Sequence, residues 1–455
     1  MTSESRASAD MPMWKMRGLL ATKEVTPKEL VGAAISRAEV TNQTVGNLLT
    51  IRGEEAMEEA RDAERRLASG DRSPLLGIPI TVKDVLSTRG IRTTAGSILF
   101  DTYVPEEDAE AVKRAREAGA IIIGKGNTSE FGLFWRTQNR LMQECVNPND
   151  TTRAAGGSSG GDAASVAAGV VPVALGSDRG GSGRIPASWC GVVGHQSGFD
   201  VIGSAGSMVP SLFFSGVSPI GSCARDVETL FGVIARPHKG GGRPMGQLAN
   251  RGGGSRRRPL RVGWWSGDEY VEPEVRGRCL EVIGELAESD VDVNYLNWFG
   301  DSEAEEAYWL VNDADRATLF AKKIRSVPGW EEQVCDYVHE RIVHGDVTST
   351  QTVMEALLTR REFMRRMDGI FSDYDFIVTP TVPIRAPRLS EAEHVTRGLV
   401  TRYTWQVNFG DLTGASVPIS AAGALPVGLQ VIGRKRSDLA VLRLCADIER
   451  CVGAS

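Results

Sequence analysis

Apolar residues recur at helical spacing over residues 26–69, in a stretch rich in alanine, glutamate and arginine. Thr26 and the following Pro27 are typical of a helix N-terminus, because the threonine oxygen can accept a hydrogen bond from the first turn and proline suits the first helical position. Gly70 is typical of the residue just past a helix C-terminus. We therefore expect the segment 1–70 to be helical.

Short apolar runs then alternate with helical patterns. The runs at 75–86 and 120–124 are rich in isoleucine and valine and predict buried strands, whereas the patterns at 108–117 and 226–235 predict helices. Apolar strands that alternate with helices indicate an α/β sheet with helices on both faces.

The alternation returns in the second half of the chain. Residues 303–370 have an irregular, mainly helical pattern. Strands are predicted at 260–265, 374–383 and 424–433, and a closing helix is predicted at 438–451.

Composition excludes several classes of protein. The net charge of −6 over 455 residues does not indicate nucleic-acid binding. The seven cysteines are scattered and never spaced as CxxC, so we expect neither a disulfide scaffold nor a metal site. The start lacks the apolar stretch of a signal peptide, and no run of about 18 apolar residues suggests a membrane span. We expect a cytoplasmic protein, monomeric or homodimeric, without a cofactor. The Gly/Arg-rich stretch 236–259 predicts a surface loop rather than a basic binding patch.

Glycine and serine gather in one block, "GGSSGGDAASVAAGVVPVALGSDRGGSGRIP", over residues 156–186. Glycines let backbone N–H groups approach a ligand closely, so the block can form a nest for an anion, either a phosphate or the oxyanion of acyl transfer. A phosphate site is disfavoured, because the block contains neither GxxxxGK[ST] nor GxGxxG.

A serine nucleophile needs a base, and the sequence offers two kinds. Lys83 ends an apolar strand, where desolvation would lower its pKa and make it a usable base for Ser158, Ser159 or Ser182. A serine–histidine pair is the alternative, with His195 as the nearest histidine, and spacing alone does not exclude it. A serine–lysine arrangement accounts for the observed residues better than a serine–histidine pair does.

These motifs together resemble the signature of the amidase signature family. "GGSSGG", "AASVAAG" and "ALGSDRGGSGRIPASWCGVVG" carry the resemblance, and "GIPITVKD", "AGAIIIGKGNTSEF", "YDFIVTPTVP" and "LPVGLQVIG" extend it over residues 25–235 and 370–450. The resemblance implies a single large α/β/α domain around a mixed, mostly parallel sheet of about eleven strands. The chain would then divide into an N-terminal helical segment (1–70) and a catalytic core (75–235). A variable substrate-pocket region with the surface loop (236–370) and a C-terminal part of the core (371–455) would follow.

The resemblance also implies a Ser-cisSer-Lys triad. Ser182 matches the family's nucleophile, Ser158 its bridging cis-serine and Lys83 its base. The residues whose backbone N–H groups would hold the oxyanion are Arg179, Gly180, Gly181 and Ser182. The residues expected to support the loop are Ser177, Asp178 and Arg184, with Asp178 and Arg184 as a bracing pair. The residues expected in the substrate pocket are Asn127, Thr128, Phe131, Phe134, Trp135 and Trp309.

Three departures from the family pattern concern the substrate. Arg179 stands where a small or apolar residue is usual, which places a cation beside the oxyanion site. Gly183 replaces a branched aliphatic residue and is expected to widen or loosen the loop. The run "GHQS" at 194–197 replaces a Gly-Leu-Lys-Pro-Thr-like run.

The resemblance implies an amidohydrolase that cleaves C–N bonds of linear amides through an acyl-enzyme. Aromatic residues near the site favour hydrophobic or aryl amides, with carbamates (urethanes) or esters as further small-molecule substrates. The alternative is a glutaminase subunit of an amidotransferase complex, which would need a partner surface and a pocket for the carboxylate and ammonium of glutamine.

Overall fold

The computed structural model describes residues 11–214, 216–236, 259–265, 270–289, 291–296, 302–421 and 423–453. All but the ends of the predicted surface loop at 236–259 lie outside these residues. No helix in the described ranges is long and apolar enough to cross a membrane.

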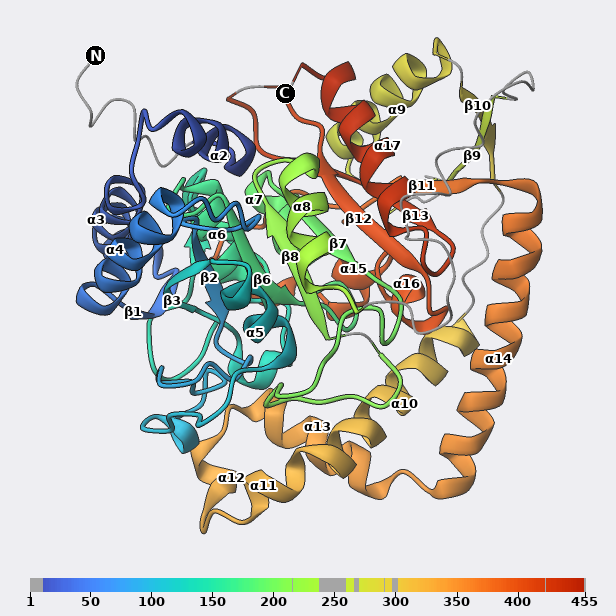
Figure 1. Ribbon diagram of the computed structural model, residues 1–455. Helices are drawn as coiled ribbons and strands as arrows, with labels where there is room; N and C mark the ends of the chain where they lie inside the picture. The colour runs from blue at the N-terminus through green and yellow to red at the C-terminus, as the bar shows by residue number, and fades with distance from the viewer. Residues whose placement is uncertain are drawn as a thin grey trace.

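An eleven-stranded sheet forms the centre of the molecule, in the order β1-β3-β2-β6-β8-β7-β12-β13-β11-β9-β10 (Figure 1). Its strands are β1 (Leu48–Ile51), β2 (Pro79–Lys83), β3 (Ile121–Gly126), β6 (Val173–Ser177), β7 (Val193–Gln196), β8 (Val217–Gly221), β9 (Leu260–Trp264), β10 (Val291–Tyr295), β11 (Phe376–Pro380), β12 (Thr413–Pro418) and β13 (Gly428–Gly433). A separate hairpin consists of β4 (Val146–Asn147) and β5 (Asp150–Ala154).

The sheet is mixed, as expected, but most neighbouring strands in it do not run parallel. The pairs β3-β2, β2-β6, β11-β9 and β9-β10 are parallel, whereas the six other neighbouring pairs are antiparallel. A parallel pair needs a long crossover connection, whereas antiparallel strands can follow one another after a short loop. The connection between β12 and β13 is short and of this second kind. Because antiparallel pairs are the majority, the expectation of a mostly parallel sheet is wrong.

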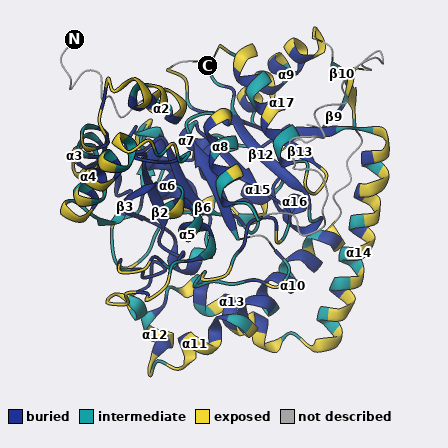
Figure 2. Cartoon of the chain, in the orientation of Figure 1, coloured by how far each residue is buried: buried dark blue, intermediate teal, exposed yellow. Residues whose placement is uncertain are grey.

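Helices cover both faces of the sheet, and alternate residues of one strand therefore pack in different cores. On β3, Ile121 and Ile123 pack in a core with α3 (Pro27–Val45), α4 (Glu54–Ala68) and α6 (Gly160–Ala167). Ile122 lies in the other core, with α5 (Glu110–Glu117), α8 (Ala224–Ile234) and α17 (Asp438–Cys451). Figure 2 shows the strands buried between helices whose outer faces are exposed. The α/β fold is confirmed.

The N-terminal segment is less purely helical than its pattern predicts. It contains α2 (Met13–Thr22), α3 and α4, and Thr26 and Glu29 form a reciprocal capping box at the start of α3. Gly70 follows α4 with a φ of +95°, as a residue just past a helix does. Between the helices, however, lies β1, which pairs antiparallel with β3 at the edge of the sheet. Four residues are too short a run for the pattern to separate strand from helix.

The region before β11 is helical, as predicted, and extends away from the sheet in Figure 1. The remaining helices are α7 (Arg184–Cys190), α9 (Pro273–Ala287), α10 (Ser302–Leu319), α11 (Ala321–Arg325), α12 (Trp330–Gln333), α13 (Asp336–Val347), α14 (Thr350–Asp373), α15 (Arg397–Thr401) and α16 (Trp405–Phe409), with short 3₁₀ turns at Ile98–Phe100, Glu130–Gly132 and Ala392–His394. α10, α15 and α16 reach back to the end of β6 and contribute to the site described next.

Candidate functional site

Lys83 and Ser177 are brought together by the sheet, because β2 and β6 are parallel neighbours and each ends at one of these residues. Lys83 is completely buried. Its Nζ donates hydrogen bonds to the Oγ atoms of Ser158 at 2.7 Å, Ser159 at 2.9 Å and Ser177 at 2.8 Å. The lysine therefore lies at the centre of three hydroxyl groups.

Burial lowers the pKa of Lys83 from 10.5 to about 7, although Asp162 and Asp178 act in the opposite direction. A lysine with this pKa is substantially neutral near pH 7. Its nitrogen then has a lone pair and can accept a proton from a neighbouring hydroxyl.

The two serines of "GGSSGG" lie against the loop after β6. The peptide bond from Gly157 to Ser158 is cis, as the family resemblance implies. The backbone N–H of Ser159 donates to the carbonyl of Ser182 at 3.0 Å, so the two serine segments are adjacent. The Ser159 hydroxyl donates to the carbonyl of Ser177 at 2.9 Å. Lys83, Ser158, Ser177 and Ser182 thus gather in one place.

The bracing pair that the sequence predicts is formed. Arg184 donates from Nε to Asp178 Oδ2 at 2.9 Å and from a terminal nitrogen to Asp178 Oδ1 at 3.0 Å, and both side chains are fully buried. Burial alone would raise the pKa of Asp178, but the Arg184 guanidinium outweighs it and holds the pKa below its ordinary value. Arg184 also donates to Gln430 and Asn408, at 2.7 Å each, which ties the loop to the C-terminal part of the sheet.

The predicted oxyanion site needs a correction at Gly181. Its N–H donates to Asp178 Oδ1 at 2.8 Å and is therefore not directed at a ligand. Within the described part of the chain, no residue accepts a hydrogen bond from the N–H groups of Arg179, Gly180 or Ser182. Three of the four predicted donors therefore remain, because the buried Asp178 carboxylate takes the fourth.

Two side chains that belong to none of the sequence motifs hold this loop. Tyr308 on α10 donates to the carbonyl of Arg179 at 2.9 Å, and Thr404 donates to the carbonyl of Gly180 at 2.7 Å. A Cβ on Gly180 would lie 2.1 Å from the Tyr308 hydroxyl, so only glycine fits under this contact. Tyr308 and Thr404 lie 129 and 224 residues away in sequence from the loop residues that they contact, and neither belongs to a local motif.

The two departures in the loop have different structural consequences. Arg179 donates from one terminal nitrogen to the carbonyls of Val209, at 3.0 Å, and Pro210. Gly183 does not widen the loop, contrary to that part of the expectation. A Cβ there would lie 2.1 Å from Ser218 Oγ, which itself donates to the carbonyl of His195 at 2.7 Å, so the serine fills the space.

A cavity opens at Ser182, and three of the six predicted pocket residues line it: Phe134, Trp135 and Trp309. Gly132, Gly157 and Ile185 also line it, together with three arginines, Arg179, Arg316 and Arg397. Arg316 and Arg397 are not among the predicted pocket residues, because both lie in helices outside the sequence motifs that indicate the site.

The other three predicted pocket residues lie elsewhere. Asn127 donates to the carbonyl of Gly46 at 2.7 Å and accepts from Asn139, and Thr128 donates to the neighbouring carbonyl of Ser129, so both support loops. Phe131 packs between Phe100 and Phe320, at ring-centroid distances of 6.0 and 5.5 Å.

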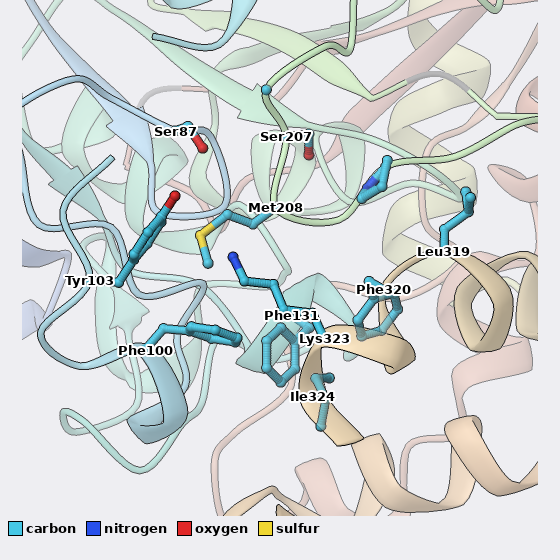
Figure 3. A pocket seen from close by; sticks show the side chains of 12 residues that line it. Ser87, Phe100, Tyr103, Phe131, Ser207, Met208, Leu319, Phe320, Lys323 and Ile324 are labelled. Atoms are coloured by element: carbon cyan, nitrogen blue, oxygen red, sulfur yellow. The ribbon is translucent and has the colours of Figure 1, made fainter. Parts of the chain in front are cut away.

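Figure 3 shows Phe131 in the wall of a second cavity of about 250 Å³, which Tyr103, Met208 and Lys323 also line. Ser182 does not line it. The expectation that Phe131 belongs to the pocket of the nucleophile is therefore wrong.

His195 is engaged away from the serines. Its Nε2 lies 3.0 Å from Asp438 Oδ1 on α17, and its ring packs edge-on against Phe231 on α8. The histidine nearest in sequence is therefore not placed to act as the base of a serine–histidine pair.

Comparisons with known proteins agree with this geometry. A family model described as Amidase matches residues 29–442. The chain is 33% identical to a glutamyl-tRNA(Gln) amidotransferase subunit of Anaeromyxobacter sp. (strain K), over 95% of this chain and 94% of that protein. Among solved structures, it superposes on an amidase with a TM-score of 0.84 at 27% identity, over 97% of this chain and 99% of the other. It also superposes on the corresponding amidotransferase subunit of Thermotoga maritima, with a TM-score of 0.74 at 25% identity, over 97% and 95% of the two chains.

Proposed function

The chain belongs to the amidase signature family, and from that premise we propose that it hydrolyses the C–N bond of a small amide through an acyl-enzyme. One observation carries the proposal: a fully buried lysine with a lowered pKa donates to Ser158 beside the loop that bears Ser182. In this proposal Ser182 is the nucleophile, Ser158 the proton relay and Lys83 the base.

The reaction begins with neutral Lys83. Its nitrogen accepts the hydroxyl proton of Ser158, Ser158 accepts that of Ser182, and Ser182 Oγ bonds to the carbonyl carbon. The N–H groups of Arg179, Gly180 and Ser182 stabilise the negative oxygen. The proton then returns through Ser158 to the leaving nitrogen as the C–N bond breaks. Water then attacks the acyl-enzyme, Ser158 and Lys83 accept its proton as before, and the proton returns to Ser182 as the acid is released.

The side chains at the cavity support an aryl or otherwise apolar group in the substrate. Phe134 and Trp135 pack together with ring centroids 5.6 Å apart, and Trp309 lines the cavity with them. Rings of this kind contribute apolar contact area to a bound ligand. Carbamates and esters present a similar carbonyl to Ser182 and are further candidate substrates.

A glutaminase subunit is the second candidate, which the 33% identical relative favours. Glutamine carries an α-ammonium group, and a site that binds it needs an acceptor for that charge. Among the described residues that line the cavity, none is aspartate or glutamate. This lining favours a substrate without an ammonium group.

The test compares the wild-type protein with Ser182→Ala on aryl amides, aliphatic amides, carbamates, esters and glutamine. We expect Ser182→Ala to lower kcat on the preferred substrate at least about 1,000-fold. Ser372→Ala, which changes an exposed serine on α14, is the matched control and should retain full activity. Equal activity of the wild type and Ser182→Ala would show that another group is the nucleophile, and a preference for glutamine would favour the second candidate.

A further inference from the structure

Four arginines gather around the cavity that contains Ser182. Arg179 follows β6, Arg316 is on α10, Arg341 on α13 and Arg397 on α15. Arg316 and Arg341 are 6% and 8% exposed, and the side chain of Arg179 is 12% exposed. Arg179, Arg316 and Arg397 line the cavity itself.

Two carboxylates lie among the three buried arginines, and both have other partners. Asp313 pairs with Arg341 at 2.6 Å and with His344 at 3.0 Å, and is 3.6 Å from Arg316. Asp315 accepts hydrogen bonds from Ser211 Oγ at 2.6 Å and from the N–H of Leu212 at 3.1 Å, and lies 4.0 Å from Arg179. Within the described part of the chain, the only ion pair of Arg316 is with Asp313, a carboxylate that it shares with Arg341 and His344.

Arg316 lines the cavity with a guanidinium that is incompletely hydrogen-bonded. Among the described residues, buried nitrogens of Arg179 and Arg341 also have no hydrogen-bond partner, but Arg341 does not line the cavity. In Arg316, Nε and one terminal nitrogen are buried and have no hydrogen-bond partner within the described part of the chain. Burial, followed by repulsion from Arg341 and Arg179, lowers its pKa from 12.5 to about 9. A guanidinium has five N–H donors, and burying them without acceptors costs free energy. A ligand that supplies acceptors and a negative charge would remove this cost.

Arg397 extends the same positive region at the edge of the cavity. Its guanidinium carbon lies 3.6 Å from the centroid of the Trp309 ring, and this cation–π contact fixes the side chain where both residues line the cavity. Glu305 accepts a hydrogen bond from Trp309 but does not line the cavity.

We propose that this cavity recognises an anionic substrate: an amide that carries a carboxylate elsewhere in the same molecule and no ammonium group. Arg316 binds the carboxylate with assistance from Arg397, while the scissile carbonyl lies at Ser182. Arg316 and Arg397 are thus specificity-determining residues. This inference rests on the proposed amide hydrolysis and names its substrate class.

A kinetic experiment compares two 4-nitroanilides: that of glutaric acid, which retains one free carboxylate, and that of hexanoic acid, which is neutral. Release of nitroaniline reports cleavage of the amide in both. We expect the wild type to have a kcat/KM at least tenfold higher for the glutaryl anilide. Arg316→Gln should lose at least tenfold on the glutaryl anilide and change less than threefold on the hexanoyl anilide. Arg316→Lys should recover part of the preference. Arg361→Gln, at an exposed arginine of α14, should leave both rates unchanged.

A binding experiment separates this inference from the proposed function. Glutarate and hexanamide are titrated into Ser182→Ala, with and without Arg316→Gln, by calorimetry. Glutarate should bind more tightly than hexanamide, and Arg316→Gln should weaken glutarate binding at least tenfold. If this binding is found but the wild type releases no nitroaniline, the inference holds and the proposed function fails. If both anilides are cleaved equally and Arg316→Gln lowers both rates alike, the inference fails and the proposed function holds. If glutarate binding is independent of Arg316, the inference fails whatever the kinetics.

Thermal unfolding distinguishes recognition from support of the fold. Asp313 retains Arg341 and His344 as partners when Arg316 is removed. We therefore expect Arg316→Gln to have an unchanged or higher Tm, and glutarate to raise the Tm of the wild type more than that of the variant. A large fall in Tm together with equal loss of both activities would identify Arg316 as a structural residue and overturn the assignment.

Discussion

The charge state of Lys83 is set by two opposing contributions. Burial favours the neutral amine, whereas the nearby Asp162 carboxylate favours the ammonium. Asp162 is itself buried, which raises its pKa, and Lys83 opposes that rise. The proposed base therefore depends on a carboxylate that does not hydrogen-bond to it in this structure but accepts a hydrogen bond from Thr81 at 3.0 Å.

Activity should rise with pH through about 7, because only the neutral form of Lys83 accepts a proton. Asp162→Asn removes a charge that raises the pKa of Lys83. The ammonium should then lose its proton at lower pH, so the acid limb of the kcat/KM profile should move to lower pH by at least about half a unit. The measurement is the pH profile of wild type, Asp162→Asn and the exposed control Asp62→Asn. An acid limb that stays in place or moves to higher pH in Asp162→Asn contradicts this account.

Gly183 and Ser218 should behave as a coupled pair. A methyl group at Gly183 would overlap the Ser218 hydroxyl, so we expect Gly183→Ala to lower the free energy of unfolding by about 1–3 kcal/mol and to reduce kcat. Combining it with Ser218→Gly should recover at least about 1 kcal/mol relative to the sum of the single changes. Urea unfolding of the four proteins in the cycle measures this coupling. Strict additivity would mean that the two residues do not share the space.

Among the helices, strands and loops, the sequence predicted the parts of the site that depend on local pattern. The apolar runs identified β2 and the strands near the C-terminus, and the glycine block identified the loops of Ser158 and Ser182. Patterns could not predict which carbonyls Tyr308 and Thr404 contact, because those hydrogen bonds join segments more than 100 residues apart. Nor could they show that Arg316 lies at the cavity of Ser182, since a buried arginine in an irregular helix has no periodic signal.

The contact of Thr404 with the loop after β6 should be visible in kcat. Thr404→Val keeps the shape but removes the hydrogen bond to the carbonyl of Gly180. We expect kcat to fall about tenfold with a change in KM below threefold, because misdirected N–H groups stabilise the transition state less. The free energy of unfolding should fall by only about 1 kcal/mol. Steady-state kinetics against Thr318→Val, an exposed threonine with a local hydrogen bond on α10, checks this. A rise in KM with constant kcat would assign Thr404 to substrate binding instead.

Across the full length of the chain, one helix end joins segments from both termini. Asp226, in the first turn of α8, accepts hydrogen bonds from the N–H groups of Met13, at 2.5 Å, and Trp14, at 3.0 Å, at the start of α2. Glu449 on α17 accepts from the N–H of Ala224 with both oxygens, at 3.0 and 3.1 Å. Two carboxylates thus meet at the N-terminus of α8, where the positive end of the helix favours them but burial and mutual repulsion do not.

These contacts at the N-terminus of α8 predict a loss of stability as the pH rises from 4.5 through about 7. Burial, together with repulsion from Asp226, raises the pKa of Glu449 from 4.5 to about 7, despite its hydrogen bond from Ala224. The folded protein therefore holds a proton that the unfolded chain releases, and the resulting stability is fully present below pH 4.5 and lost as the pH rises through 7.

Glu449→Gln can accept the same hydrogen bond without acquiring charge. Its free energy of unfolding should match that of the wild type at pH 4 and exceed it by about 2–3 kcal/mol at pH 8. Urea unfolding at both pH values measures the difference, with Glu58→Gln on the exposed face of α4 as the control that should show none. If Glu449→Gln were instead less stable than the wild type at pH 8, the ionised carboxylate would be holding α17 to α8, and charge rather than a hydrogen bond to a neutral side chain would join these two helices.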